Sequence, residues 1–197
     1  MAFTNYDSKE INCKIVYFGP EGSGKTENLR AIYKQTSPDG SGGMLEFEDP
    51  SGPTKFFDFL PVSLGHYREF HIKLHLFTIP SNSLYESVRS VILKGVDGYV
   101  FVADARMECM SQNVTALEEA QRLLQAEGYQ INELAAVIQY NKTDLSDLIP
   151  TDILRRDLNP GGLADQEAVA TNLVGTLETL NALGQQVLKK IGAHLSS

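Results

Sequence analysis

One segment of this chain constrains its fold more than any other: residues 19–26, which read G-P-E-G-S-G-K-T. They fit the pattern G-x-x-x-x-G-K-[ST]. An apolar run rich in β-branched and aromatic residues, Ile11 to Phe18, precedes the segment, and a helical pattern with Leu29, Ile32 and Tyr33 on one face follows it. A strand, a glycine-rich loop and a helix in this order are typical of a P-loop fold.

Five more strand-like runs follow and alternate with helical patterns. They cover residues 56–64, 70–77, 98–103, 134–140 and 167–170. A turn around residues 65–67 joins the first two runs into an antiparallel hairpin, whereas the alternation of strands and helices elsewhere favours parallel pairing. We therefore predict an α/β fold of the P-loop NTPase class, in which a six-stranded, mostly parallel sheet has one antiparallel hairpin and helices on both faces.

The length of 197 residues suits one domain, residues 1–197, with a full core. Residues 37–53 are mostly Gly, Pro, Ser and acidic residues, which predicts a mobile loop, and Met44 to Phe47 is the strand-like fragment within it. Between residues 84 and 93 the pattern indicates a short helix. A final amphipathic helix carries Leu177 to Ile191.

Charge and hydropathy exclude several classes of partner. The formal net charge of −8 and the pI near 5.0 disfavour a nucleic-acid backbone as the main partner. No segment approaches the roughly 18 apolar residues of a membrane span, and residues 1–10 contain no apolar run, so we expect a cytoplasmic protein without an integral membrane segment. Cys13 and Cys109 form no metal-binding pattern and are predicted to be reduced structural thiols.

The glycine-rich segment is the candidate phosphate site. Backbone N–H groups of such a loop converge on phosphate, and the dipole of the following helix adds positive potential. Lys25 is expected between the β- and γ-phosphates, and the hydroxyl of Thr26 suits a Mg²⁺ ligand. The predicted phosphate-binding residues in this loop are Gly19, Glu21, Gly22, Ser23, Gly24, Lys25 and Thr26. A glycine-rich turn without a ligand is the alternative.

A second motif, Asn141-Lys142-Thr143-Asp144, directly follows the strand-like run 134–140. The carboxylate of Asp144 can accept hydrogen bonds from the N1–H and 2-amino groups that guanine has and adenine lacks, which is worth roughly a hundredfold in selectivity. The backbone N–H of Ala170 is placed to meet the base O6. We therefore predict guanine binding by Asn141, Lys142, Asp144 and Ala170, with GTP or GDP as the ligand; a polar turn after a strand is the alternative.

With these residues, the chain resembles the Ras-like small GTPases and, within them, the bacterial MglA group of polarity and motility switches. The matches extend over nearly the whole chain. Besides the two motifs, they include the runs T-K-F-F-D-F-L-P at 54–61, K-G-V-D-G at 94–98 and E-A-V-A-T at 167–171.

The resemblance implies a guanine-nucleotide-dependent switch that controls cell polarity and motility. Its switch regions would contact effector proteins and a roadblock-type activating protein similar to MglB, and protein partners would recruit it to a cell pole. The resemblance also makes Thr54 the first-switch threonine, which binds Mg²⁺ and the γ-phosphate, and places Ser81 beside that phosphate.

The chain departs from the MglA pattern at its catalytic positions. MglA-like proteins carry an arginine finger before the switch threonine, whereas this chain has Pro53. Their second switch usually ends in Gly-Gln, and the glutamine orients the attacking water. Here Ser81-Asn82 stands in its place, so Asn82, one methylene shorter, is the candidate catalytic residue. Arg68 and Arg89 are the two arginines that could substitute for the missing finger, although Arg89 is expected at a surface position of a helix.

Three functions stay open from the sequence. The first is a switch with weak intrinsic GTP hydrolysis, since a finger arginine alone is worth about 10³ to 10⁵ in rate. The second is a pseudo-GTPase scaffold that binds nucleotide without hydrolysing it. The third is a P-loop kinase or ATPase, which Asp144 disfavours because adenine would leave its carboxylate unpaired.

Overall fold

The strand that leads into the glycine-rich loop, β2 (Glu10–Phe18), lies inside the sheet with β5 on one side and β6 on the other, and its last four residues are all buried. A computed structural model describes residues 3–37, 43–48, 55–79 and 86–194. The remaining strands are β1 (Phe3–Asn5), β3 (Leu45–Glu48), β4 (Lys55–Tyr67), β5 (Phe70–Thr78), β6 (Val96–Asp104), β7 (Ala135–Asn141) and β8 (Ala164–Ala168).

The strand order is β3-β4-β5-β2-β6-β7-β8, and β1 pairs with the start of β2. Four neighbouring pairs are parallel: β2 with β5, β2 with β6, β6 with β7, and β7 with β8. The pairs that involve β3 and β4 are antiparallel. The predicted α/β class, with a mostly parallel sheet and an antiparallel hairpin, is confirmed.

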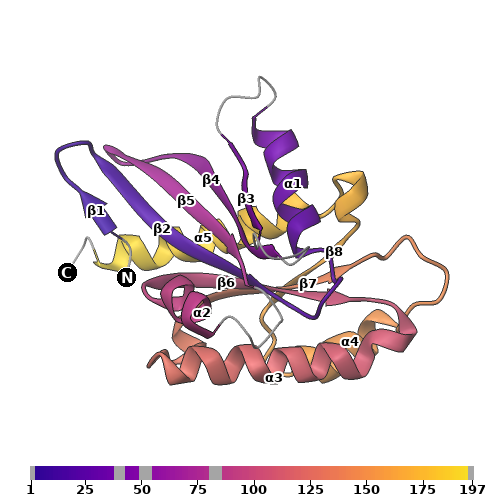
Figure 1. The fold of residues 1–197 in the computed structure, drawn as a ribbon. Helices are drawn as coiled ribbons and strands as arrows, with labels where there is room; N and C mark the ends of the chain where they lie inside the picture. The colour runs from indigo at the N-terminus through magenta and orange to yellow at the C-terminus, as the bar shows by residue number, and fades with distance from the viewer. Residues whose placement is uncertain (1–2, 38–42, 49–54, 80–85, 195–197) are drawn as a thin grey trace.

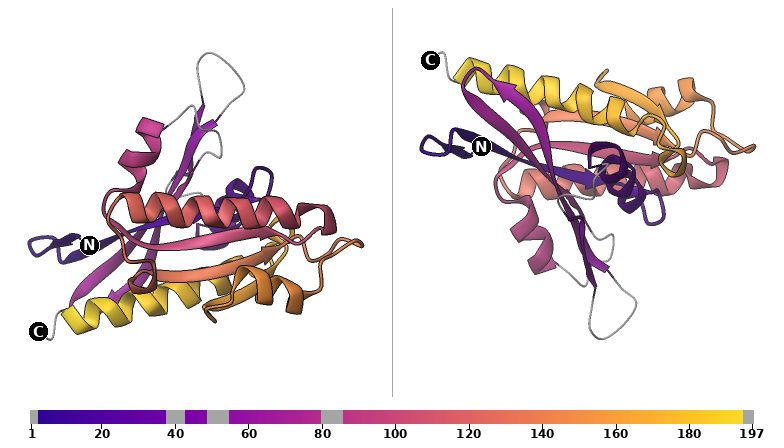
Figure 2. Two further views of the ribbon diagram at one scale, coloured as in Figure 1. Left: turned by 90° about the horizontal axis from the view of Figure 1, so that it is seen from below. Right: turned by 90° about the horizontal axis from the view of Figure 1, so that it is seen from above.

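Helices cover both faces of this sheet (Figure 1), as predicted. One apolar cluster joins the sheet to α1 (Lys25–Thr36) and α5 (Thr176–His194); the other joins it to α2 (Glu86–Leu93), α3 (Met110–Ala126) and α4 (Thr151–Leu158). Figure 2 shows α3 in front of the sheet in the view from below and α5 in front in the view from above. In the described part of the chain, none of the helices combines the length and apolar character that a membrane crossing requires.

The prediction of six strands was wrong, because the described residues form eight. The first additional strand, β1, folds back on β2 through a turn in which Asn5 Oδ1 accepts hydrogen bonds from the N–H groups of Asp7 and Ser8. The second, β3, is the fragment noted within the loop at 37–53. It pairs with β4 and stacks Phe47 on Phe57 at 4.4 Å between ring centroids. Pairing with β4, rather than local composition, makes this fragment a strand.

The hairpin turn also lies later than predicted. β4 continues to Tyr67, and the chain reverses at Arg68 and Glu69. Gly65 instead marks a register shift in the β4–β5 pairing, with φ +90°, a conformation that suits glycine at a bulge. The last strand is earlier than the predicted 167–170, since β8 ends at Ala168 and Ala170 begins a short 3₁₀ helix.

Both cysteines are free and buried, as the sequence predicts. Cys13 points from β2 into the cluster under α1 and α5, and burial raises the pKa of its thiol to about 12. Cys109 precedes α3 and is buried beside the end of β6. Burial likewise raises the pKa of this second thiol. Both side chains therefore act as apolar packing groups at neutral pH.

Candidate functional site

The glycine-rich loop connects the end of β2 to the start of α1 and has glycine where its backbone requires it. Gly19, Gly22 and Gly24 all have positive φ, at 141°, 72° and 100°. A Cβ atom on Gly19 would lie 2.2 Å from the carbonyl oxygen of Val102, and one on Gly24 would lie 2.3 Å from Asn141 Nδ2. The loop is therefore packed directly against β6 and against the Asn141 segment.

Lys25 folds back over this loop. Its Nζ donates hydrogen bonds to the carbonyl oxygens of Gly19 at 2.9 Å and Pro20 at 2.8 Å. Desolvation lowers the pKa of this ammonium to about 8, while the carboxylates of Glu21 and Asp58 act in the opposite direction. A desolvated cation whose hydrogen bonds go to neutral carbonyl groups favours an anion close to the loop.

Thr26 contacts a buried carboxylate that the sequence analysis missed. Its hydroxyl donates to Asp58 Oδ2 at 2.6 Å, and the hydroxyl of Thr78 donates to the same oxygen at 3.0 Å. Asp58 is 1% exposed, and its Oδ1 has no hydrogen-bond partner among the described residues. Because Mg²⁺ prefers hydroxyl and carboxylate oxygens, Thr26 together with this unpartnered oxygen fits such a cation.

Asn141, the last residue of β7, joins three parts of the chain. Its Nδ2 donates to the carbonyl oxygen of Ser23 at 2.8 Å, and its Oδ1 accepts from the N–H of Ala170 at 3.1 Å. Asn141 is 2% exposed. The side chain thus connects the glycine-rich loop to the segment after β8. The Ala170 N–H that we expected to face a base is directed at Asn141 instead.

The next residues form a cavity of about 230 Å³ beside the loop, with Gly22, Gly24, Lys142, Asp144 and Ala170 among its lining residues. Lys142 has φ 69°, and its Nζ donates to Asp104 Oδ2 at 2.6 Å. Asp144 is exposed. The structure therefore brings the four predicted guanine-binding residues to one site next to the predicted phosphate loop.

Several predicted residues lie outside the described part of the chain. These are Thr54, Ser81 and Asn82, together with Pro53. The two alternative arginines are both described. Arg68 lies in the β4–β5 turn, at the start of β5, whereas the glycine-rich loop lies next to the other end of this strand. At about 3.3 Å per residue, the length of the strand separates the two by roughly 30 Å. This distance is too long for an arginine side chain to span.

The expectation that Arg89 occupies a surface position was wrong. It is 4% exposed, and its Nη1 donates to Glu119 Oε1 at 2.8 Å across the space between α2 and α3. A small cavity there is also lined by Gly19 and Pro20. The helical period of α2 does not reveal this burial, because α3 covers the side that the short helix would otherwise expose.

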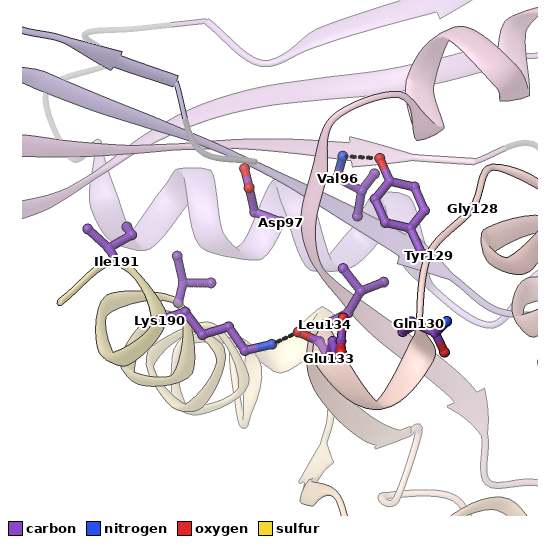
Figure 3. A pocket seen from close by; sticks show the side chains of 10 residues that line it. Val96, Asp97, Gly128, Tyr129, Gln130, Glu133, Leu134, Lys190 and Ile191 are labelled. Carbon is purple, nitrogen blue, oxygen red and sulfur yellow. Dashed lines mark hydrogen bonds between the residues drawn. The ribbon is translucent and has the colours of Figure 1, made fainter. Parts of the chain in front are cut away.

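A larger cavity, of about 340 Å³, lies at the opposite end of β6 (Figure 3). Val96, Tyr129, Leu134 and Ile191 contribute apolar surface, and the Tyr129 hydroxyl accepts from the N–H of Val96 at 3.0 Å. At its rim, Lys190 Nζ donates to the carbonyl oxygen of Glu133. Val96 begins β6, whereas the Lys142 site adjoins the end of that strand, so this cavity is separate from the candidate site.

The chain is similar to a known motility protein over nearly its whole length. The chain is 44% identical over 191 residues to the Mutual gliding-motility protein MglA of Myxococcus xanthus (strain DK1622), and the alignment covers 97% of this chain and 98% of that protein. No protein-family model matches the chain. This identity over nearly the full length of both proteins shows the family to which the chain belongs.

The contact between Gly24 and Asn141 leads to a stability prediction. Gly24→Ala adds a Cβ that meets the Asn141 amide, so we expect the free energy of unfolding without nucleotide to fall by about 3–5 kcal/mol, from backbone strain and a disrupted buried amide. The matched control is Gly22→Ala, where a Cβ meets nothing within 4 Å and only about 1–2 kcal/mol of backbone strain is expected. Urea unfolding measures both, and equal losses would contradict the role of Asn141.

Proposed function

Because the chain belongs to the MglA-type small GTPases, we propose that it is a guanine-nucleotide switch that controls cell polarity and motility through contacts of its switch regions with effector proteins. The observation that supports this most directly is the double hydrogen bond of Asn141, which joins the predicted phosphate loop to the predicted guanine loop. GTP and GDP are the ligands. The protein acts in the cytoplasm, and protein partners recruit it to a cell pole.

The phosphate end of the ligand occupies the glycine-rich loop. Lys25 exchanges its two carbonyl partners for the β- and γ-phosphates, and backbone N–H groups of the loop supply the remaining donors. At the other end, Asp144 accepts from the guanine edge while Lys142 forms a wall of the cavity. Asp144 distinguishes GTP from ATP by this contact.

Thr26, Asp58 and Thr54 are the residues that would hold Mg²⁺. When bound, Mg²⁺ neutralises charge on the β- and γ-phosphates. Asp58 contributes a carboxylate from β4 that stays next to the Thr26 hydroxyl because Thr78 holds it in place. This arrangement connects the Mg²⁺ site to β4 and thereby to the segment that carries Thr54.

Hydrolysis is slow in this proposal. Pro53 offers no charge to the transition state, and Asn82 orients water less well than a glutamine in its place. A roadblock-type activating protein similar to MglB supplies the missing groups. The second candidate, a nucleotide-bound scaffold that does not hydrolyse GTP, is favoured by the same two residues.

The experiment that tests the proposal starts with the nucleotide that copurifies with the protein. We expect GDP or GTP, and we expect preloaded GTP with Mg²⁺ to convert to GDP over hours, at or below the rate of about 10⁻⁴ s⁻¹ that Ras shows unaided. GTP that persists unchanged supports the scaffold instead. Bound adenine nucleotide would overturn the guanine assignment.

The Asp58 carboxylate gives a prediction about Mg²⁺. In the natural protein, we expect chelation of Mg²⁺ to speed GDP release strongly. In Asp58→Asn, release is already fast and responds less than threefold to chelation, because the variant lacks the charge that holds the cation. Stopped-flow release of fluorescent GDP measures this effect.

The control for Asp58→Asn is its free energy of unfolding without nucleotide or Mg²⁺. It should fall by no more than about 1–3 kcal/mol, since asparagine still accepts from Thr26 and Thr78, and the cost is limited to burying its amide NH₂ group in place of the unpartnered Oδ1. A variant that folds normally and keeps the full response to chelation would remove Asp58 from the cation site.

Lys25 predicts a pH dependence. Its pKa of about 8 in the nucleotide-free protein rises when phosphate binds, because an anion favours the charged ammonium. Affinity for GDP is therefore independent of this group well below pH 8 and weakens as pH rises through 8, with proton uptake on binding. Calorimetry at pH 8.5 in two buffers of different ionisation enthalpy measures that uptake. The Lys25→Arg variant stays charged and should abolish the proton uptake. If the uptake is unchanged in this variant, another group than Lys25 takes up the proton.

A further inference from the structure

The Lys142 side chain, which lines the cavity, is fixed both at its backbone and at its ammonium group. Its backbone has φ 69°, directly after the buried Asn141. Its ammonium donates to Asp104 Oδ2 at 2.6 Å. The four-carbon stem between these two points therefore lines the 230 Å³ cavity and is tied down at its far end instead of moving freely in solvent.

Asp104, the last residue of β6, is itself rigidly placed. Its side chain is 2% exposed, and its backbone N–H and C=O both bond to the side-chain amide of Asn113, at 2.9 and 2.7 Å. Asn113 lies on α3 and is completely buried. The backbone that carries the carboxylate is thus fixed by a strand end and by a helix that belong to the core.

The Asp104 carboxylate pairs with two cationic side chains. Besides Lys142, Arg106 donates to it from Nη2 at 2.9 Å and from Nε at 3.1 Å. Arg106 also pairs with Glu108 through Nη1 at 2.8 Å, so the four charges balance. Burial raises the pKa of Asp104, but the hydrogen bonds from Arg106 and Lys142 outweigh it and hold this pKa below its usual value.

Asp104 keeps a cationic partner without Lys142, because Arg106 pairs with the same carboxylate. With Lys142 removed, Arg106 still forms four hydrogen bonds to the carboxylate: one from its backbone N–H, two from Nε and one from Nη2. Because the Arg106 guanidinium already pairs with this buried carboxylate, losing the Lys142 contact leaves no unpaired charge at Asp104. The Lys142 contact therefore serves the position of the lysine more than the stability of the fold.

We infer that Asp104 is a positioning residue for the base of the nucleotide, because it holds the Lys142 stem in the place where the stem packs against the guanine ring. The inference rests on the proposed function. A free lysine side chain must be ordered when the base binds, which costs about five- to twentyfold in affinity. Asp104 removes this cost before the ligand arrives.

The test compares two variants and their combination, with N-methylanthraniloyl-GDP as the probe. Asp104→Asn should speed probe release five- to twentyfold. Lys142→Met keeps an apolar stem without the ammonium and should cause a similar change. The double variant should be no worse than the worse single variant, since both changes remove the same contact. Additive effects of the two changes would overturn the inference.

Two controls separate positioning from damage to the fold. The affinity for inorganic pyrophosphate should stay within twofold in all variants, because Asp104 acts only on the base end of the site. A loss of pyrophosphate binding equal to the loss of GDP binding would show a general defect and overturn the inference. Asp165→Asn, which breaks another carboxylate–arginine pair on β8, should leave probe release within twofold.

The proposed function can fail independently. If the natural protein binds pyrophosphate but not the guanine probe, the guanine assignment is wrong whatever Asp104 does. If the natural protein binds the probe tightly and Asp104→Asn releases it at the natural rate, guanine binding stands and the positioning role of Asp104 is wrong.

Discussion

The buried amide of Asn141 is the contact on which the geometry of the site depends. Its two hydrogen bonds join residues 118 and 29 positions apart in the sequence. A buried amide that lost either partner would cost about 1–3 kcal/mol, so the glycine-rich loop and the segment after β8 are held in one relative position. That connection is short only because β2, β6, β7 and β8 are parallel and end at the same edge of the sheet.

Next to the Asn141 contacts, the site contains two charged groups that the protein desolvates, Lys25 and Asp58. Lys25 is desolvated against two carbonyl oxygens, and Asp58 keeps one buried oxygen without a partner in the described structure. Desolvating a charged group destabilises a fold to the extent that opposite charges nearby do not compensate it. A phosphate anion and a divalent cation would compensate both at once. The protein thus retains a local cost that the proposed ligands offset on binding.

Much of this site follows from local sequence signals. The pattern at residues 19–26 specifies a loop whose glycines adopt positive φ, and all three of those glycines do so. The run 134–140 predicts a strand with Asn141 at its carboxyl end, and β7 ends at Asn141 in the structure. Strand β3 and the late hairpin turn were harder to predict, because cross-strand pairing with β4 and β5 decides them against local composition.

The sequence by itself determined the chemistry of the two loops, the α/β class and the resemblance to the MglA-type GTPases, since these depend on residue type, spacing and hydrophobic period. Tertiary structure alone decided that Asp58 meets Thr26, that Asp104 holds Lys142 and that Arg89 is buried against α3. Each of these contacts joins residues at least 30 positions apart. Such contacts are set by strand order, register and helix packing, which no local propensity encodes.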